Sequence, residues 1–268
     1  MKRTLGYAMT LSTLMFIMVG YATADLADDL IVHFTFDNVK GKRILDESGN
    51  GLDAKVIKNT EFVKGKYGKA IRITKETEDC VNIPSADALE ISGEITMMAW
   101  VYHEDWAGSS SQWFDKGCYS RVSSYGMVVF SKVDAHSSGI GVVLGGEHQV
   151  RFIIQNSMKN KTWHHIVATS DSASVKFYLD GEILNPPGHL PPDFQFNFKG
   201  INDEDLRIGC AKHRPQYAFE GGSIDEVAIW SRALSDNEIK TAMRSSLLSV
   251  SPQGKVATTW GNIKRKAF

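Results

Sequence analysis

Residues 174–182 read SVKFYLDGE, and this stretch carries the clearest structural signal in the chain. The apolar residues Val175, Phe177 and Leu179 share one face of an extended segment, while the residues between them take the other face. Asp180 and Gly181 follow, a pair that adopts positive φ at little cost and suits a tight turn between two strands. The stretch therefore predicts a β-hairpin.

Similar short alternations recur along most of the chain. They are separated by Gly, Ser, Asp and Asn and occur at 30–37, 69–74, 95–102, 125–130, 139–144, 150–155, 164–170 and 205–209. Many short strands with such punctuation predict an all-β sandwich, barrel or jelly roll. One convincing helix is expected near the end, where Ser235 is placed as N-cap and Glu238 completes a capping box.

The first 24 residues have the features of a secretory signal peptide. Lys2 and Arg3 supply a positive start, an apolar run covers 8–21, and the small residues 22–24 form a cleavage site. An uncleaved anchor is the alternative. We expect a secreted or cell-envelope protein with one large domain over residues 25–245 and a basic tail over 246–268. No second hydrophobic span follows, so we expect no membrane span in the mature chain.

Charge and cysteine content narrow the function further. The net charge is −1, and no basic stripe with interleaved aromatic residues indicates nucleic-acid binding. The three cysteines are Cys80, Cys118 and Cys210, so one disulfide and one free thiol are expected, with three pairings possible. The pair Cys118–Cys210 is preferred because both lie in Gly-containing stretches. A zinc site is not expected, since nothing completes four ligands around Cys210 and His213.

Eight ordered blocks of sequence resemble the laminin G-like jelly roll domains of the concanavalin A-like lectin and glucanase superfamily. They include DESGNGLDA at 46–54, TWHHIVATSDSASVKFYLDGE at 162–182 and GSIDEVAIWSRALSDNEI at 222–239. The resemblance covers about residues 29–244. It implies two antiparallel sheets packed face to face, one convex and one concave, with a short helix after the last strand. It does not fix a function, because this fold hosts lectins, adhesive modules and glycosidases.

The resemblance also implies a structural calcium ion. In such sandwiches the first and last strands are neighbours, which would bring Asp37 close to Asp225. Carboxylates and backbone carbonyls suit calcium, which takes six to eight oxygen ligands. The expected ligands are Asp37 and Asp225, supplemented by oxygens near Asn50, Gly51 and Gly222. The alternative is that both aspartates only accept backbone hydrogen bonds in turns.

Catalysis is not expected. Asp225 and Glu226 are adjacent on a strand, so we expect them on opposite faces and unable to flank one glycosidic bond. The E-x-D-x-x-E strand of the superfamily's glucanases is absent from the sequence. His164 and His165 lie in a strand pattern, and a structural role is favoured for both.

A ligand-binding surface is expected instead, most simply for a carbohydrate. Lectin sites combine an aromatic platform with polar side chains that bind hydroxyl groups. The irregular segments offer such residues: Trp106, Trp113, Asp115, Tyr119, Arg121, His136, His213, Arg214 and Tyr217. Two alternatives stay open. One is an adhesive module that binds a surface protein, and the other is a hydrolase with an unfamiliar carboxylate pair from Glu104, Asp105 or Asp115.

Overall fold

The computed structural model describes most of the chain from residue 25 onward. The described residues are 25–58, 60–74, 80–91, 93–106, 111–117, 125–134, 137–144, 149–154, 158–171, 174–184, 202–212, 219, 221–244 and 247. Among them, no helix has the length and apolar character needed to cross a membrane. The predicted signal peptide lies outside the described residues, and so does the predicted basic tail apart from Leu247, which is buried in a second apolar cluster.

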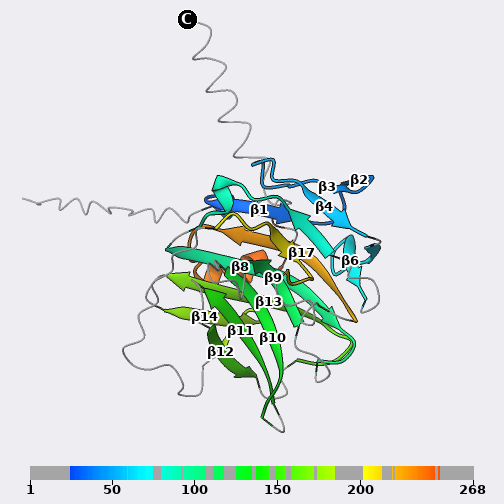
Figure 1. Ribbon diagram of the computed structural model, residues 1–268. Coiled ribbons are helices and arrows are strands. Elements are labelled where there is room, and N and C mark those ends of the chain that lie inside the picture. The colour runs from blue at the N-terminus through cyan, green and yellow to red at the C-terminus, as the bar shows by residue number, and fades with distance from the viewer. Residues whose placement is uncertain are drawn as a thin grey trace, which may run out of the picture.

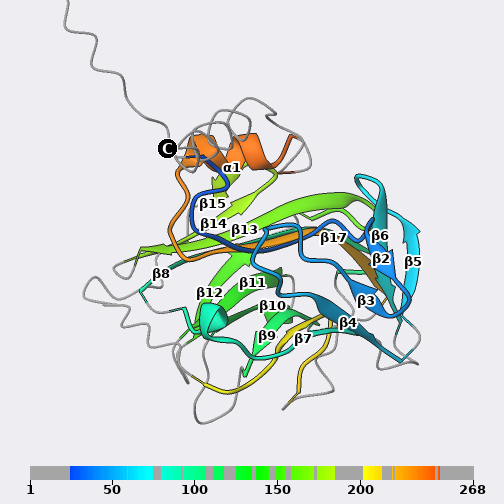
Figure 2. The ribbon, with the colours of Figure 1, turned by 90° about the horizontal axis from the view of Figure 1, so that it is seen from above.

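Two antiparallel sheets form the molecule, and Figure 2 shows them as two layers. One sheet has eight strands in the order β15 (Glu182–Leu184), β14 (Val175–Leu179), β13 (Trp163–Asp171), β8 (Glu94–His103), β17 (Gly222–Trp230), β6 (Lys69–Ile73) and β5 (Glu61–Lys64), with β1 (Leu30–Phe34) also paired to β17. The predicted two-sheet sandwich is therefore confirmed.

The second sheet has nine strands. Their order is β12 (Gln149–Ile154), β11 (Ser137–Leu144), β10 (Tyr125–Asp134), β9 (Ser111–Lys116), β16 (Leu206–Ile208), β7 (Cys80–Ile83), β4 (Ala54–Ile57), β3 (Arg43–Ile44) and β2 (Val39–Lys40). A short 3-10 helix, η1 (Asp87–Leu89), follows β7. Alternate residues of both sheets enter one core between the layers, including Phe34, Met97, Phe114, Phe177 and Ile208. Burial of each such side chain contributes about 1.5–3 kcal/mol.

A second apolar cluster lies outside the sandwich, beneath the helix α1 (Asp236–Ala242). Figure 2 shows α1 over the outer face of the eight-stranded sheet, where Met98, Tyr178 and Trp230 pack against Ile239. The predicted capping box is present, since the Ser235 side chain accepts from the Glu238 backbone and Glu238 accepts from Ser235 N at 2.8 Å. The cap fixes where the helix starts on the sheet.

The predicted hairpin is also confirmed. β14 pairs with β15, and the two turn residues have φ of 53° at Asp180 and 82° at Gly181. Positive φ at both positions is the conformation that a two-residue hairpin turn needs to match the twist of its strands.

The last strand, β17, changes its neighbour halfway along. Residues 222–224 pair with β6, whereas residues 227–230 pair with β1, which lies alongside β17 in Figure 1. Between the two halves the pairing to β8 shifts register from Asp225 to Ala228, and Glu226 has φ of 48°. This is a β-bulge, which adds a residue and changes the direction of side chains.

The disulfide corrects one prediction. Cys210 is bonded to Cys80, with their Cα atoms 5.5 Å apart, and not to Cys118. The physical reason is strand pairing: β16 lies antiparallel to β7, with Ile208 opposite Val81, so the residues just beyond that pair meet. Sequence position in a glycine-containing loop carried no information about this contact. Cys118 itself lies outside the described residues.

We predict that the double substitution Cys80→Ser/Cys210→Ser lowers the free energy of unfolding by about 2–5 kcal/mol, because the bridge closes a long loop in the unfolded chain. Urea unfolding measured by fluorescence would show this. Cys118→Ser is the matched control and should leave the bridge intact. Appearance of a new free thiol in Cys118→Ser would show that the pairing described here is wrong.

Candidate functional site

A row of polar side chains crosses the outer face of the nine-stranded sheet. Asp115 of β9 lies opposite Arg207 of β16, Arg207 lies opposite Asn82 of β7, and Asn82 lies opposite Lys55 of β4. Their neighbours along each strand enter the core between the sheets: Phe114, Leu206, Ile208, Val81, Ile83, Ala54 and Val56. Because side chains alternate along a strand, the row faces away from the core.

The exposed fraction of the side chains rises along this row from Asp115 to Lys55. Asp115 is only 1% exposed, Arg207 and Asn82 are half-buried, and Lys55 is exposed. Ile57, which follows Lys55 on the same face of β4, is 37% exposed. The accessible part of the face therefore lies over β16, β7 and β4, and we call it the β16–β7–β4 face.

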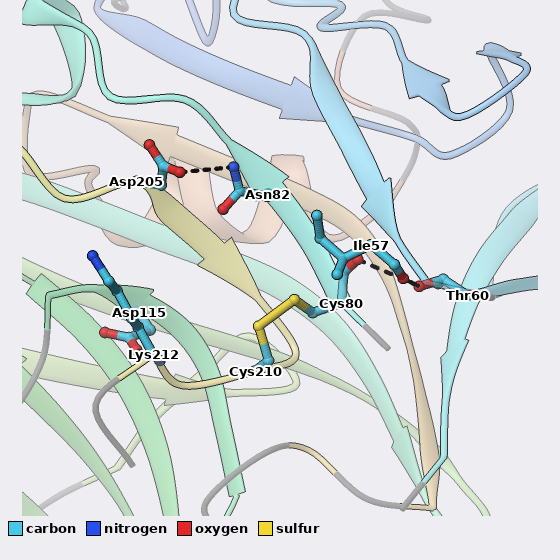
Figure 3. Close-up of a disulfide and its surroundings, with 8 residues drawn as sticks. All are labelled: Ile57, Thr60, Cys80, Asn82, Asp115, Asp205, Cys210 and Lys212. Atoms are coloured by element: carbon cyan, nitrogen blue, oxygen red, sulfur yellow. Dashed lines mark hydrogen bonds between the residues drawn. A yellow bond between two sulfur atoms is a disulfide. The ribbon is translucent and has the colours of Figure 1, made fainter. Parts of the chain in front are cut away.

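The acidic groups of the face are held in place by hydrogen bonds. Asp115 Oδ2 accepts from the Lys212 backbone N–H at 2.8 Å. Asp205, which directly precedes β16, accepts from Asn82 Nδ2 and from the Ser85 backbone N–H, both at 2.9 Å. Figure 3 shows Asp205 and Asn82 joined in this way beside the disulfide. The orientations of Asp115, Asp205 and Asn82 are therefore fixed before any ligand binds.

Two features anchor β16, the short strand at one side of the face. The Cys80–Cys210 bridge ties the chain just after β16 to the start of β7 (Figure 3). Before β16, the ammonium group of Lys116 is fully buried and donates to Glu90 Oε1 at 2.7 Å and to the Asn202 and Glu204 carbonyls, both at 2.9 Å. Both ends of the strand are therefore held.

The structure places the residues predicted to bind a ligand in three groups. Asp115 lies on the polar row. Trp106 and Trp113 lie in the core, with side chains that are 4% and 0% exposed. Their rings contact each other edge to face, with ring centroids 5.9 Å apart. The expectation that they form an exposed platform is therefore wrong, because both rings fill space between the sheets. The other six lie outside the described residues: Tyr119, Arg121, His136, His213, Arg214 and Tyr217.

Arg207, Asn82, Asp205 and Lys55 were not among the predicted ligand residues. The alternation in DLRIG and VNIP already places Arg207 and Asn82 on the face opposite the apolar residues. What the sequence does not supply is that the strands carrying them are neighbours.

A second polar cluster surrounds the bulge in β17, on the other sheet. His33 Nε2 lies 2.9 Å from Glu226 Oε2, with the two side chains 0% and 3% exposed. Asp225 Oδ2 accepts from the Tyr67 backbone N–H at 2.9 Å. Ile224 and Val227 both enter the core, so the two acidic residues between them both lie off it. The prediction that Asp225 and Glu226 occupy opposite faces is therefore wrong, and the bulge is the reason.

Asp37 and Asp225 converge on one turn, residues 65–69, as predicted from the pairing of the first and last strands. Asp37 Oδ1 accepts from Lys69 N at 2.8 Å, two residues after the Asp225 contact. Any side chain at Gly65 or Gly68 would collide with these carboxylates, so glycine permits the approach. Burial is the main cause that raises the pKa of Asp225 to about 8, and Glu226 adds to the rise.

The other expected calcium ligands lie elsewhere. Asn50 Nδ2 donates to the Leu30 and Ile31 carbonyls at 2.8 Å, at the opposite end of β1 from Asp37. Gly51 follows it on the same loop. Gly222 pairs with His103 and Ile73, three residues along β17 from Asp225, a span of roughly 10 Å. The five residues therefore do not form one site. Among the described residues, no group of three or more His, Cys, Asp or Glu could hold a metal ion.

The outer face of the eight-stranded sheet is closed beside this cluster. Trp100 and His165 contact each other with ring centroids 5.1 Å apart, and the Lys66 ammonium lies 4.2 Å from the Trp100 ring centroid. The Tyr67 hydroxyl donates to the Met243 carbonyl at 3.0 Å, joining the turn to the end of α1. His165 is 0% exposed, and neither of its ring nitrogens has a hydrogen-bond partner. Burial lowers its pKa to about 3.

We predict that His165→Phe stabilises the protein by about 1 kcal/mol at neutral pH, because it removes a buried polar ring without partners. The unfolded chain protonates His165 near pH 6.5 and the folded chain only near pH 3. Protonation of His165 in the unfolded chain therefore does not affect the free energy of unfolding above pH 6.5. Below pH 6.5 it lowers that free energy progressively as the pH falls toward 3.

The advantage of His165→Phe over the wild type should grow as the pH falls from 6.5 to about 4. The raised pKa of Asp225 acts in the opposite direction, lowering stability as the pH rises from 3.8 to about 8. That contribution is the same in both proteins and cancels in their difference. Urea unfolding at several pH values in chelator measures the difference, and parallel curves for the two proteins would contradict the prediction.

Comparisons with known proteins agree with this architecture. A family model described as the concanavalin A-like lectin/glucanases superfamily matches residues 75–240. No curated protein sequence matches the chain. Domain 4 of AbnA, an extracellular GH43 arabinanase from Geobacillus stearothermophilus solved with arabinotriose, aligns with a TM-score of 0.59 and 18% identity, over 81% of this chain and 98% of that domain.

Two toxin domains have a similar fold. The binding domain of Paraclostridial Mosquitocidal Protein 1 aligns with a TM-score of 0.59 and 16% identity. The binding domain of botulinum neurotoxin DC, solved in complex with SialylT, aligns with a TM-score of 0.57 and 12% identity. Each alignment covers 82% of this chain but only 52% of the toxin chain. At these identities the likeness concerns the fold alone. With the family model matching more than half of its length, the chain belongs to the concanavalin A-like lectin/glucanase superfamily.

Proposed function

We propose that this chain is a secreted, non-catalytic module that binds a carbohydrate on the β16–β7–β4 face. The polar row from Asp115 to Lys55 carries the proposal. The guanidinium, carboxamide and ammonium groups of its accessible members, Arg207, Asn82 and Lys55, supply donors and an acceptor that sugar hydroxyls bind. The expected signal peptide supports an extracellular or cell-envelope location.

The comparisons add general support. The AbnA domain was solved with arabinotriose and the neurotoxin domain with SialylT, so binding modules, some of them with a sugar ligand, share this fold. Because one fold hosts several functions, this likeness raises the expectation of binding without naming a ligand. The residues on the face are what make the proposal specific to this chain.

The adhesive alternative finds less support among the described residues. A protein-binding surface favours a continuous apolar patch. The large apolar side chains that are exposed in the described part of the chain are Ile57 and Ile183, and they belong to different sheets. A polar row with little apolar surface suits a sugar better than a flat protein partner.

The placement of the candidate carboxylates supports a non-catalytic role. Asp115 belongs to β9 of the nine-stranded sheet and faces away from the core. Glu104 and Asp105 follow β8 of the other sheet, and Glu104 forms an ion pair with Arg72 at 2.8 Å. A glycosidase needs two carboxyl groups on either side of one bond, about 5–9.5 Å apart. The placement of these carboxylates on different sheets gives no support for such a pair.

A structural calcium ion forms a second part of the proposal, and we infer that it belongs at the 65–69 turn. Asp37 and Asp225 would hold it, with backbone carbonyls of the turn as further ligands. Asp225 is fully buried beside the acidic Glu226, and Glu226 already pairs with His33. Both Asp225 oxygens accept backbone N–H groups, and among the described residues no cationic side chain pairs with them, so a bound cation would offset the cost of burying the charge. Bound calcium would fix the turn against β17.

For sugar binding, we predict that Asn82→Ala weakens the affinity for the bound glycan at least tenfold, because it removes an oriented amide at the centre of the face. A glycan array would identify the ligand, and isothermal titration calorimetry would measure the change. Asn237→Ala, on the exposed side of α1 across the molecule, is the matched control and should bind normally. A blank array together with capture of one surface protein would contradict the carbohydrate proposal.

For calcium, we predict that addition of the ion after chelation raises the melting temperature by several degrees, since a ligand at 100 times its Kd adds about 2.7 kcal/mol. The increment should disappear in Asp37→Asn and Asp225→Asn and persist in Asp87→Asn, which changes an exposed aspartate of η1. Only the calcium-dependent increment is compared, so any direct loss of stability in a variant does not affect the result. A wild-type melting temperature indifferent to calcium would contradict the metal proposal.

A further inference from the structure

Arg207 occupies an unusual position at the β16 side of the β16–β7–β4 face. It lies between Asp115 on one neighbouring strand and Asn82 on the other. Its Nε is buried and has no hydrogen-bond partner. Among the described residues, no carboxylate forms an ion pair with its guanidinium group. Arg207 therefore presents a charged, half-buried donor group without an acceptor.

The acidic side chains nearest in the strand pairing are engaged elsewhere. Asp115 Oδ2 accepts from the Lys212 backbone, and both oxygens of Asp205 accept from Asn82 and Ser85. The ammonium of Lys212 is itself paired with Glu204. The charged groups around Arg207 therefore have partners of their own, and none of them forms a salt bridge with its guanidinium group. An arginine beside two aspartates could readily have formed one.

Leaving such a group unpaired has a cost. A buried N–H without a partner destabilises the folded state by about 1–3 kcal/mol, and by more when the group is charged. Nε itself is shielded from solvent, so a ligand would bind the terminal nitrogens of the guanidinium, and an anion bound there would balance its charge. The planar guanidinium matches a carboxylate best, because two parallel N–H groups can bind its two oxygens. A neutral sugar hydroxyl accepts only a single such bond.

We propose that the glycan bound on this face carries a carboxylate, as uronic and sialic acids do, and that Arg207 binds it. The inference rests on the proposed carbohydrate function and names the class of sugar. Asn82 and the exposed Lys55, the next residues along the row, would contact the ring hydroxyls beside the acid. Asp115 on the other side limits the carboxylate to the open part of the face.

The test compares acidic sugars with uncharged counterparts. Oligogalacturonate and oligoglucuronate are each measured against their methyl esters, and sialylated glycans against the same glycans without sialic acid, by array and calorimetry. The wild type should bind the acidic member of at least one pair tenfold or more tightly. Arg207→Gln should abolish that preference, so that the acidic and neutral members of the pair bind with similar affinity. Arg72→Gln, a half-buried arginine on the other sheet, is the control and should keep the preference.

The outcomes separate this inference from the function on which it rests. Binding of neutral and acidic sugars with equal affinity, or a preference that survives in Arg207→Gln, would overturn the role of Arg207 and leave the carbohydrate proposal standing. Absence of binding to any glycan would overturn both. Circular dichroism of Arg207→Gln would verify that a lost preference does not arise from unfolding, and Arg207→Lys, which keeps the charge without the planar group, should recover only part of it.

Discussion

The change of partner along β17 is the constraint on which the sandwich depends. One strand must pair first with β6 and then with β1, and the bulge at Asp225 and Glu226 makes that change possible. At the junction the sheet loses regular backbone pairing, and carboxylates replace it: Asp225 accepts the Tyr67 N–H, while Glu226 pairs with His33. The acidic pair on a buried strand is therefore explained by the architecture and requires no catalytic role.

The two outer faces of the sandwich have different properties. The eight-stranded sheet is covered by α1 and by the 65–69 turn, which are joined to each other through Tyr67 and Met243. The nine-stranded sheet carries a row that becomes more exposed toward β4, held at β16 by a disulfide and by the buried Lys116. Rigid support beneath oriented polar groups is what a binding site needs, because little ordering is then left for the ligand to impose.

Local features of the fold could be predicted from the sequence, and features that depend on long-range pairing could not. Alternation and capping residues such as Ser235 act within a few positions, so the strands, the hairpin and the helix start were predictable. The partner of Cys210 depends on the pairing of β16 with β7. The direction of the Glu226 side chain depends on the bulge in β17, which pairs with β8, β6 and β1. Arg207 was overlooked because its strand is short and its neighbours on the face come from distant parts of the chain.

We propose that ligand binding belongs to the open face over β16, β7 and β4, and that the helix-covered face is structural. Backbone amide chemical shifts, followed by NMR during titration with a bound oligosaccharide, test it most directly. We expect the largest shifts on Lys55, Asn82 and Arg207. Shifts concentrated on Tyr67, Trp100 and α1, with the polar row unaffected, would contradict it.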